Sequence, residues 1–183
     1  MAERSDHDPT VLPKFLAHLE PRDACAAGLA RRLLDSGWGV ESLWGPAQMD
    51  VWELRVRRDA VAVRFGVERG KSDGVLIGPA ESAYDDLAPL SFAVLGWARA
   101  SGAELPLDDP DEFRPDYGAY GAQAAEWVRT GGRDAFARIA EARRQYLLRR
   151  HSLDQRLGDV WLARTKAWGA EMLEAAAAPR DPA

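Results

Sequence analysis

The segment from Val51 to Ile77 alternates apolar and charged residues more regularly than any other part of the chain. Successive side chains of a β-strand point to opposite faces of the sheet, so a period of two predicts strands with one apolar face. That face carries Trp52, Leu54 and Val56 in a first strand and Val61, Val63, Phe65 and Val67 in a second. A third, shorter strand is expected around Val75–Ile77, after a loop at Arg69–Gly74. The sequence therefore predicts an antiparallel β-meander whose apolar face needs a cover.

Two helices are expected to supply that cover. The first spans Pro21–Ser36 and turns Cys25, Leu29 and Leu33 inward, with Pro21 in its first turn. The second spans Tyr84–Ser101, is mostly apolar, and is capped by Asp85 and Asp86. Pro9–Glu20 forms either a short helix or none, and Gly37–Met49 forms either a first strand or an irregular lead-in. The sequence leaves both of these alternatives open.

The chain changes character after Gly102. Residues 103–118 form an acidic, proline-broken connector, and residues 119–183 read as helices at about 119–130, 134–150 and 152–178. The last helix is expected to pack against the preceding one, along a stripe that includes Phe136, Ile139 and Tyr146. We therefore expect an α+β fold: a meander region over residues 1–102, the connector, and a C-terminal helical hairpin or bundle packed on the same single domain.

Composition limits the function classes. The chain has 183 residues, 46% hydrophobic and 29% charged, as is usual for a globular protein, and its formal charge is −5. A net negative charge disfavours nucleic-acid binding, which usually requires a basic domain. The single cysteine excludes an internal disulfide, and no apolar stretch approaches the length of a membrane span or follows a signal-peptide pattern. These features predict a cytoplasmic protein that does not act at a membrane.

No stretch of the chain carries a specific catalytic signature. The three histidines are scattered, and the spacings typical of zinc sites, nucleophile elbows and phosphate-binding loops are missing from the sequence. An acidic cluster lies in the connector and consists of Asp108, Asp109, Asp111 and Glu112. Carboxylates can hold a divalent cation, but this spacing lacks the glycine and the bidentate glutamate of an EF-hand loop. We therefore predict no catalytic residue, no metal site and no cofactor.

Two charged surfaces are candidates for binding a partner. Arg55, Arg57 and Arg64 are expected side by side on the polar face of the meander, where like charges destabilise the sheet unless acids or a partner neutralise them. Internal pairing with Glu53 and Glu68 is the alternative. The acidic cluster at 108–112 would suit a basic partner, either through direct contact or by steering its approach. A solvated acidic loop is again the alternative.

One stretch invites comparison with a known group of proteins. Residues 61–96, VAVRFGVERGKSDGVLIGPAESAYDDLAPLSFAVLG, place Arg69-Gly70 after a strand, Gly78-Pro79 after the next strand, and Tyr84 before Asp86-Leu87. This order resembles a pattern in small uncharacterised bacterial proteins, some of them similar to immunity proteins of polymorphic toxin systems. The third strand lacks the aromatic residue of that pattern. The resemblance implies an acidic, non-enzymatic protein that binds and blocks a cognate toxin.

Three function classes follow from the sequence. The first is a non-enzymatic protein-binding module, most concretely an inhibitor or immunity-type protein whose partner is another protein, such as a basic toxin. Tryptophan is favoured as an anchor at interfaces, although core packing is its commoner use. The alternatives are a small enzyme with an unrecognised site and a nucleic-acid-associated accessory protein. Neither the identity of the partner nor the oligomeric state follows from the sequence.

Overall fold

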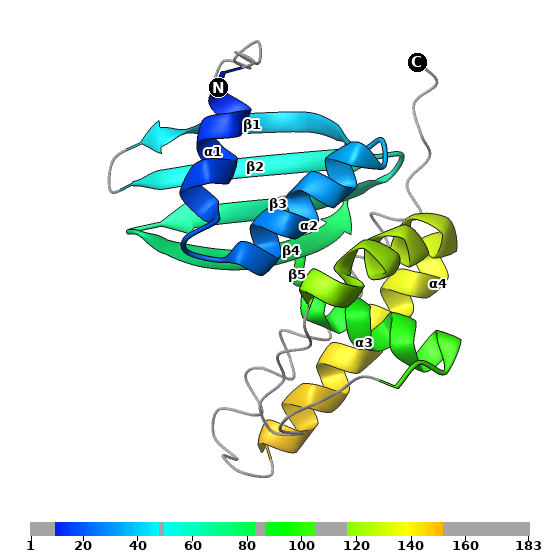
Figure 1. The fold of residues 1–183 in the computed structure, drawn as a ribbon. Helices are drawn as coiled ribbons and strands as arrows, with labels where there is room; N and C mark the ends of the chain where they lie inside the picture. The colour runs from blue at the N-terminus through cyan, green and yellow to red at the C-terminus, as the bar shows by residue number, and fades with distance from the viewer. Residues whose placement is uncertain (1–9, 48–49, 83–86, 105–116, 152–183) are drawn as a thin grey trace.

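The computed structural model describes residues 10–47, 50–82, 87–104 and 117–151, and it has the predicted α+β fold (Figure 1). The elements in chain order are α1 (Val11–Leu19), α2 (Ala24–Asp35), β1 (Gly39–Ala47), β2 (Val51–Arg58), β3 (Val61–Glu68), β4 (Lys71–Pro79), β5 (Ala88–Pro89), α3 (Leu90–Ser101) and α4 (Tyr117–His151). None of the helices in these ranges is long and apolar enough to cross a membrane.

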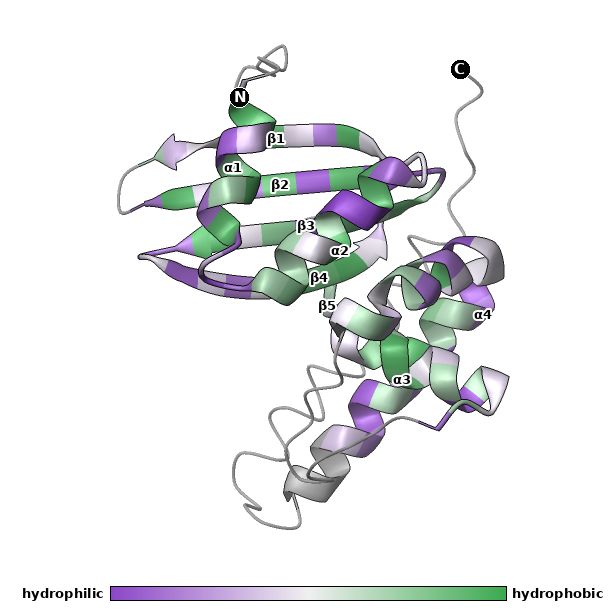
Figure 2. Ribbon diagram, in the orientation of Figure 1, coloured by the Kyte–Doolittle hydropathy of each residue, from purple (hydrophilic) through white to green (hydrophobic). Residues whose placement is uncertain are grey.

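The five strands form one antiparallel sheet in which spatial order equals chain order. Leu54 lies opposite Phe65 and Val56 opposite Val63, so the apolar side chains of β2 and β3 share one face as predicted. Figure 2 shows the corresponding alternation of hydrophilic and hydrophobic residues along β2. Gly37–Met49, which the sequence left undecided, supplies β1 at the edge of the sheet.

The strand β4 is longer than predicted. The predicted loop at Arg69–Gly74 is a two-residue turn, and Ser72, Asp73 and Gly74 already belong to the strand. Both turn residues have positive φ, 53° at Arg69 and 73° at Gly70. Turns with two positive φ angles match the twist of the flanking strands, so pairing resumes directly after them.

Helices α1 and α2 lie across the apolar face of the sheet (Figure 1). Phe15 and Leu19 of α1 and Leu29 of α2 are fully buried, as is Phe65 on the sheet. Side chains of this size each stabilise the fold by about 1.5–3 kcal/mol when they leave water. Helix α2 begins after Asp23, whose carboxylate accepts a hydrogen bond of 2.8 Å from the Ala26 amide, and not at Pro21 as predicted.

The prediction that Cys25 faces the core is wrong, because the residue is exposed. The helix begins at Ala24, after the N-cap Asp23, so Cys25 lies in its first turn. The buried residues near the start of α2 are Ala26 and Ala27. Cys25 lies one turn before the buried Leu29, so helix periodicity placed it on the inward stripe, but in the first turn the neighbouring alanines are buried and Cys25 is not.

Helix α3 begins at Leu90, six residues later than predicted, because β5 comes first. It lies beyond the β4–β5 edge of the sheet and packs against α4, so it does not cover the sheet as expected (Figure 1). Gly96 allows the close approach, since a Cβ there would meet the Trp127 ring at 3.0 Å. The ring of Tyr146, expected to face the last predicted helix, contacts Phe92 of α3 with centroids 5.7 Å apart. The predicted helix at 152–178 lies outside the described residues, as do Asp85 and Asp86.

Helix α4 consists of two arms that meet at Gly132, where φ is 51° and ψ is −130°. Such a backbone conformation is essentially restricted to glycine. The two arms correspond to the helices predicted at about 119–130 and 134–150. The first arm also packs on α2, where Gly121 faces Leu29 so closely that a Cβ would come within 2.8 Å of it.

Candidate functional site

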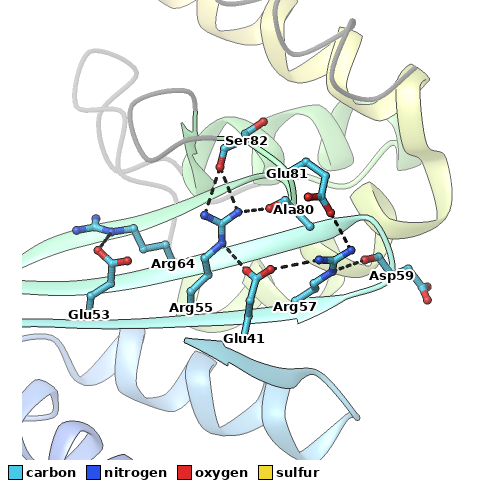
Figure 3. Close-up of polar contacts among 9 residues, drawn as sticks. All are labelled: Glu41, Glu53, Arg55, Arg57, Asp59, Arg64, Ala80, Glu81 and Ser82. Atoms are coloured by element: carbon cyan, nitrogen blue, oxygen red, sulfur yellow. Dashed lines mark hydrogen bonds and ion pairs between the residues drawn. The ribbon is translucent and has the colours of Figure 1, made fainter. Parts of the chain in front are cut away.

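The three arginines predicted as a group lie together on the sheet face that points away from α1 and α2, here called the outer face (Figure 3). Arg55 of β2 stands directly opposite Arg64 of β3, and Arg57 follows two residues along β2. Two cations in such register repel one another unless carboxylates lie between or beside them. The contacts of each arginine show how this repulsion is removed.

Arg64 is the most deeply buried of the three, with 7% of its side chain exposed. Its Nε lies 2.9 Å from Oε2 of Glu53, and its Nη1 lies 2.9 Å from Oδ2 of Asp73. The guanidinium rests on Gly66, where a Cβ would come within 2.9 Å of Nη2. Gly66 thus makes room for an arginine held between carboxylates from β2 and β4.

Arg55 fastens the chain that leaves β4 onto the outer face. Its Nε lies 2.6 Å from Oε2 of Glu41, and its Nη2 donates to the carbonyl oxygens of Ala80 and, at 3.2 Å, Ser82 (Figure 3). Because both acceptors are main-chain carbonyls, residues of any type at positions 80 and 82 could supply them. The contact therefore depends on the Arg55 guanidinium. Arg55 is therefore built into the fold.

Arg57 is the most accessible arginine of the outer face. Its guanidinium lies 3.3 Å from Oε1 of Glu41 and 3.0 Å from Oε1 of Glu81, and its Nε donates to the Asp59 carbonyl. The side chain of Arg57 is 42% exposed and that of Glu81 is 76% exposed. This pair is the part of the network that a partner can reach.

Sequence reasoning found the arginines and Glu53 but missed three of their acidic partners. Glu41 lies at an irregularity between Val40 and Ser42, which turns an extra side chain toward the arginines. Asp73 lies in the predicted loop at Arg69–Gly74, and Glu81 lies between the last predicted strand and the following predicted helix. The expected partner Glu68 lies 3.5 Å from Arg69 instead. The sequence did contain one signal. Three neighbouring arginines need more carboxylates to neutralise them than the meander strands contain, so further acidic residues had to come from other segments.

Trp44 lies on the same face, at its edge. It stands opposite Glu53 in the register of β1 and β2, and its side chain is the exposed large hydrophobic group of the described residues, at 44%. The acidic cluster of Asp108, Asp109, Asp111 and Glu112 lies outside the described residues. The outer face therefore combines Trp44 with the charged network, and the structure does not place the acidic cluster beside it.

A cleft of about 730 Å³ lies between α2, α4 and the sheet. Trp38 and the alanines Ala119 and Ala122 supply its apolar surface, and Arg32, Arg58 and Glu126 stand among its polar groups. Hydrogen bonds of 2.8 and 2.5 Å from Arg129 hold the pKa of Glu126 below its ordinary value. Sequence reasoning did not predict this cleft, because its walls come from segments far apart in the chain.

His18 joins a polar cluster at the other end of the sheet. Its Nε2 lies 3.0 Å from Oδ1 of Asp50, which also accepts a hydrogen bond of 3.2 Å from Trp52 and lies near Arg22. The cluster fastens the β1–β2 hairpin to α1.

Within the described ranges, no three His, Cys, Asp or Glu side chains converge to hold a metal ion. Comparison with known proteins gives no match to any protein-family model, curated protein or solved structure. The candidate site therefore depends on the geometry of the outer face and the cleft alone.

Proposed function

We propose that this chain is a non-enzymatic protein-binding module that uses the outer face of its sheet. The observation that supports this most directly is the exposure of Trp44 beside a network of arginines and carboxylates that the fold holds in place. Tryptophan and arginine dominate the energetics of protein interfaces. Side chains that are already fixed lose little conformational entropy on binding, which favours affinity.

The network suits a protein partner better than a nucleic acid. Each of Arg55, Arg57 and Arg64 already lies within 3.3 Å of a carboxylate oxygen. A phosphate would have to displace these carboxylates and would meet their negative charge. A protein surface can instead match alternating charges with charges of its own and place an apolar side chain on Trp44.

We further propose that the partner is a basic protein and that binding blocks its activity, as in an immunity protein and its toxin. The support is the formal charge of −5, the acidic cluster Asp108, Asp109, Asp111 and Glu112, and the sequence resemblance of residues 61–96. Opposite net charges accelerate association through long-range steering. The interaction would take place in the cytoplasm and would need no cofactor.

The test is affinity capture from the native cell with four versions of the chain, quantified by mass spectrometry. They are the wild type, Trp44→Ala, Arg57→Glu and the control Arg31→Glu. Arg31 lies on α2 and its side chain is 41% exposed, which matches the 42% of Arg57. We expect one protein to be enriched by the wild type and the control and to be lost with both outer-face variants. Equal enrichment by all four versions would show that the outer face is not the interface.

A further inference from the structure

The arginines of the cleft between α2 and α4 make fewer polar contacts than the arginines of the outer face. On the outer face the arginine side chains make two or more polar contacts each. In the part of the chain that the structure describes, Arg32 makes one side-chain hydrogen bond, to the Gly118 carbonyl, and Arg58 makes one, to the Ser36 carbonyl at 2.9 Å. A guanidinium has five N–H donors, so these hydrogen bonds use only a small part of the donors of Arg32 and Arg58.

These two arginines stand toward opposite ends of the cleft. Arg32 reaches Gly118 at the start of α4, and Arg58 approaches Glu126, with Nη1 3.8 Å from Oε2. A helix rises 1.5 Å per residue, so Gly118 and Glu126 lie about 12 Å apart along α4. This distance corresponds to roughly three or four residues of extended chain.

Between the two arginines the cleft is mostly apolar, with Gln123 as the polar side chain that α4 adds to this stretch. Trp38 is 3% exposed and lines the cleft, and Ala119 and Ala122 present only methyl groups from α4. Small side chains on one wall leave room for a large one from a partner. Apolar pockets with a polar rim are where interface anchors insert.

The charges of the cleft favour a carboxylate in addition to the apolar anchor. Glu126 is already held by Arg129, through two contacts, and lies too far from Arg58 for a hydrogen bond. Asp35 is the other acid at the cleft, and it is exposed to water. The spare donors of Arg32 and Arg58 are therefore available to a carboxylate, which arginine binds in a bidentate geometry.

We infer that this cleft binds a short segment of a partner protein, with one large apolar side chain on Trp38, Ala119 and Ala122 and an acidic residue beside Arg32. The inference rests on the proposed function in requiring a protein partner, but it concerns a second surface. The cleft is then a second binding site, separate from the outer face and with its own specificity.

The test is a selection from a random 12-residue peptide library displayed on phage, with the immobilised full chain as bait. Enriched peptides are then synthesised, and their dissociation constants are measured by fluorescence anisotropy. Ala119→Trp fills the cleft from an exposed position, and Ala137→Trp is the matched control at an exposed position on the other arm of α4. Arg32→Met is a second variant that keeps most of the side-chain volume and removes the charge.

We expect enriched peptides that combine an aromatic or large aliphatic residue with Asp or Glu. Ala119→Trp should abolish their binding, Ala137→Trp should leave it within about twofold, and Arg32→Met should weaken it by about tenfold or more, the loss expected for a hydrogen bond to a charged group. Thermal unfolding monitored by circular dichroism shows whether each variant is folded. If Ala119→Trp does not fold, Arg32→Met decides the question.

Two results would overturn the inference. One is the absence of any enriched peptide, and the other is peptide binding that Arg32→Met and Ala119→Trp leave unchanged. Neither result touches the proposed function, which depends on capture of a partner through Trp44 and Arg57. Conversely, loss of capture without any effect on peptide binding would separate the two surfaces.

Discussion

Glu41 illustrates how a single residue can hold a charged surface together. Its two carboxylate oxygens serve two arginines, Arg55 at 2.6 Å and Arg57 at 3.3 Å, and its side chain is 23% exposed. Because Arg55 in turn holds the Ala80 and Ser82 carbonyls, the carboxylate supports the path of the chain after β4. Its removal leaves a partly buried cation without its closest anion.

We expect Glu41→Gln to lower the free energy of unfolding by about 1–3 kcal/mol, the cost of leaving a partly buried charged group without its partner. Glu20→Gln is the control, because Glu20 also pairs with an arginine but its side chain is 53% exposed. Exposed pairs contribute about 0–1 kcal/mol, so the control should change little. Urea unfolding at neutral pH measures both. Equal effects of the two substitutions would mean that Glu41 is only a solvated acid.

Phe65 tests the assignment of the two sheet faces. It is fully buried, opposite Leu54, on the face that α1 and α2 cover. Replacement by alanine removes a large apolar group and leaves a cavity, so Phe65→Ala should cost about 3–5 kcal/mol. Urea unfolding measures this cost. An unchanged free energy of unfolding would contradict the assignment of the apolar face.

Glu126 predicts an acid-dependent loss of stability. Hydrogen bonds from Arg129 lower its pKa from the ordinary value of 4.5, so the folded state binds this proton less readily than the unfolded chain does. The stabilisation is therefore present above pH 4.5 and is lost as the pH falls through the lower pKa of the folded state. We expect Glu126→Gln to destabilise the protein at pH 7 and to have less effect at pH 3. Urea unfolding of wild type and variant at both pH values checks this, and an equal difference at both would contradict it.

At the scale of secondary structure, the kink in α4 depends on one glycine. Gly132 adopts φ 51° and ψ −130° between the two arms. A side chain at such an angle costs about 1–3 kcal/mol, so Gly132→Ala should destabilise the protein by that amount. Gly28→Ala in the middle of α2 is the control, because a Cβ there would meet its nearest neighbour at an ordinary 3.9 Å.

The control substitution should stabilise the protein by about 0.4–1 kcal/mol, because alanine restricts the unfolded chain without strain in the helix. Thermal unfolding monitored by circular dichroism measures both changes. Opposite signs are the expected outcome. If both substitutions stabilise the protein, the two arms of α4 can form one continuous helix.

The elements that the sequence predicts well are those with a strong local pattern. The alternation along β2 and β3 determined their faces, and the break at Gly131-Gly132 separated the two arms of α4. Element β5 and the late start of α3 were missed, because a two-residue strand has no periodicity to detect. The side on which α3 packs was missed because it depends on a close approach at Gly96, a contact between distant segments.

The candidate site was predictable to a similar degree. The arginines of the outer face follow from alternation within two adjacent strands. Their partners Glu41 and Glu81 depend on a local irregularity in β1 and on the path of the chain after β4, neither of which a local pattern reveals. The cleft requires α2 and α4 to meet, and no feature of either helix alone predicts that contact.

At the scale of the whole molecule, the acidic cluster should act on the rate of association. Reversal of Asp108, Asp109, Asp111 and Glu112 to lysine removes steering toward a basic partner, so association should slow more than dissociation accelerates. The defect should shrink as salt rises, because charges are screened beyond about 8 Å at physiological ionic strength. Stopped-flow binding to the captured partner at several salt concentrations measures this. Unchanged association rates and salt dependence would identify the cluster as a solvated loop.

The order of the strands in the sheet has a consequence for synthesis of the protein. Because β1 to β5 pair in chain order, the sheet and the two helices on it are complete by residue 89, before α3 and α4 leave the ribosome. At about 5–20 residues per second, the next 60 or so residues take roughly 3–12 s to translate. During that interval the surface of α2 around Leu29, which Gly121 later covers, faces water. Burial of this part of the core therefore waits for the arrival of α4.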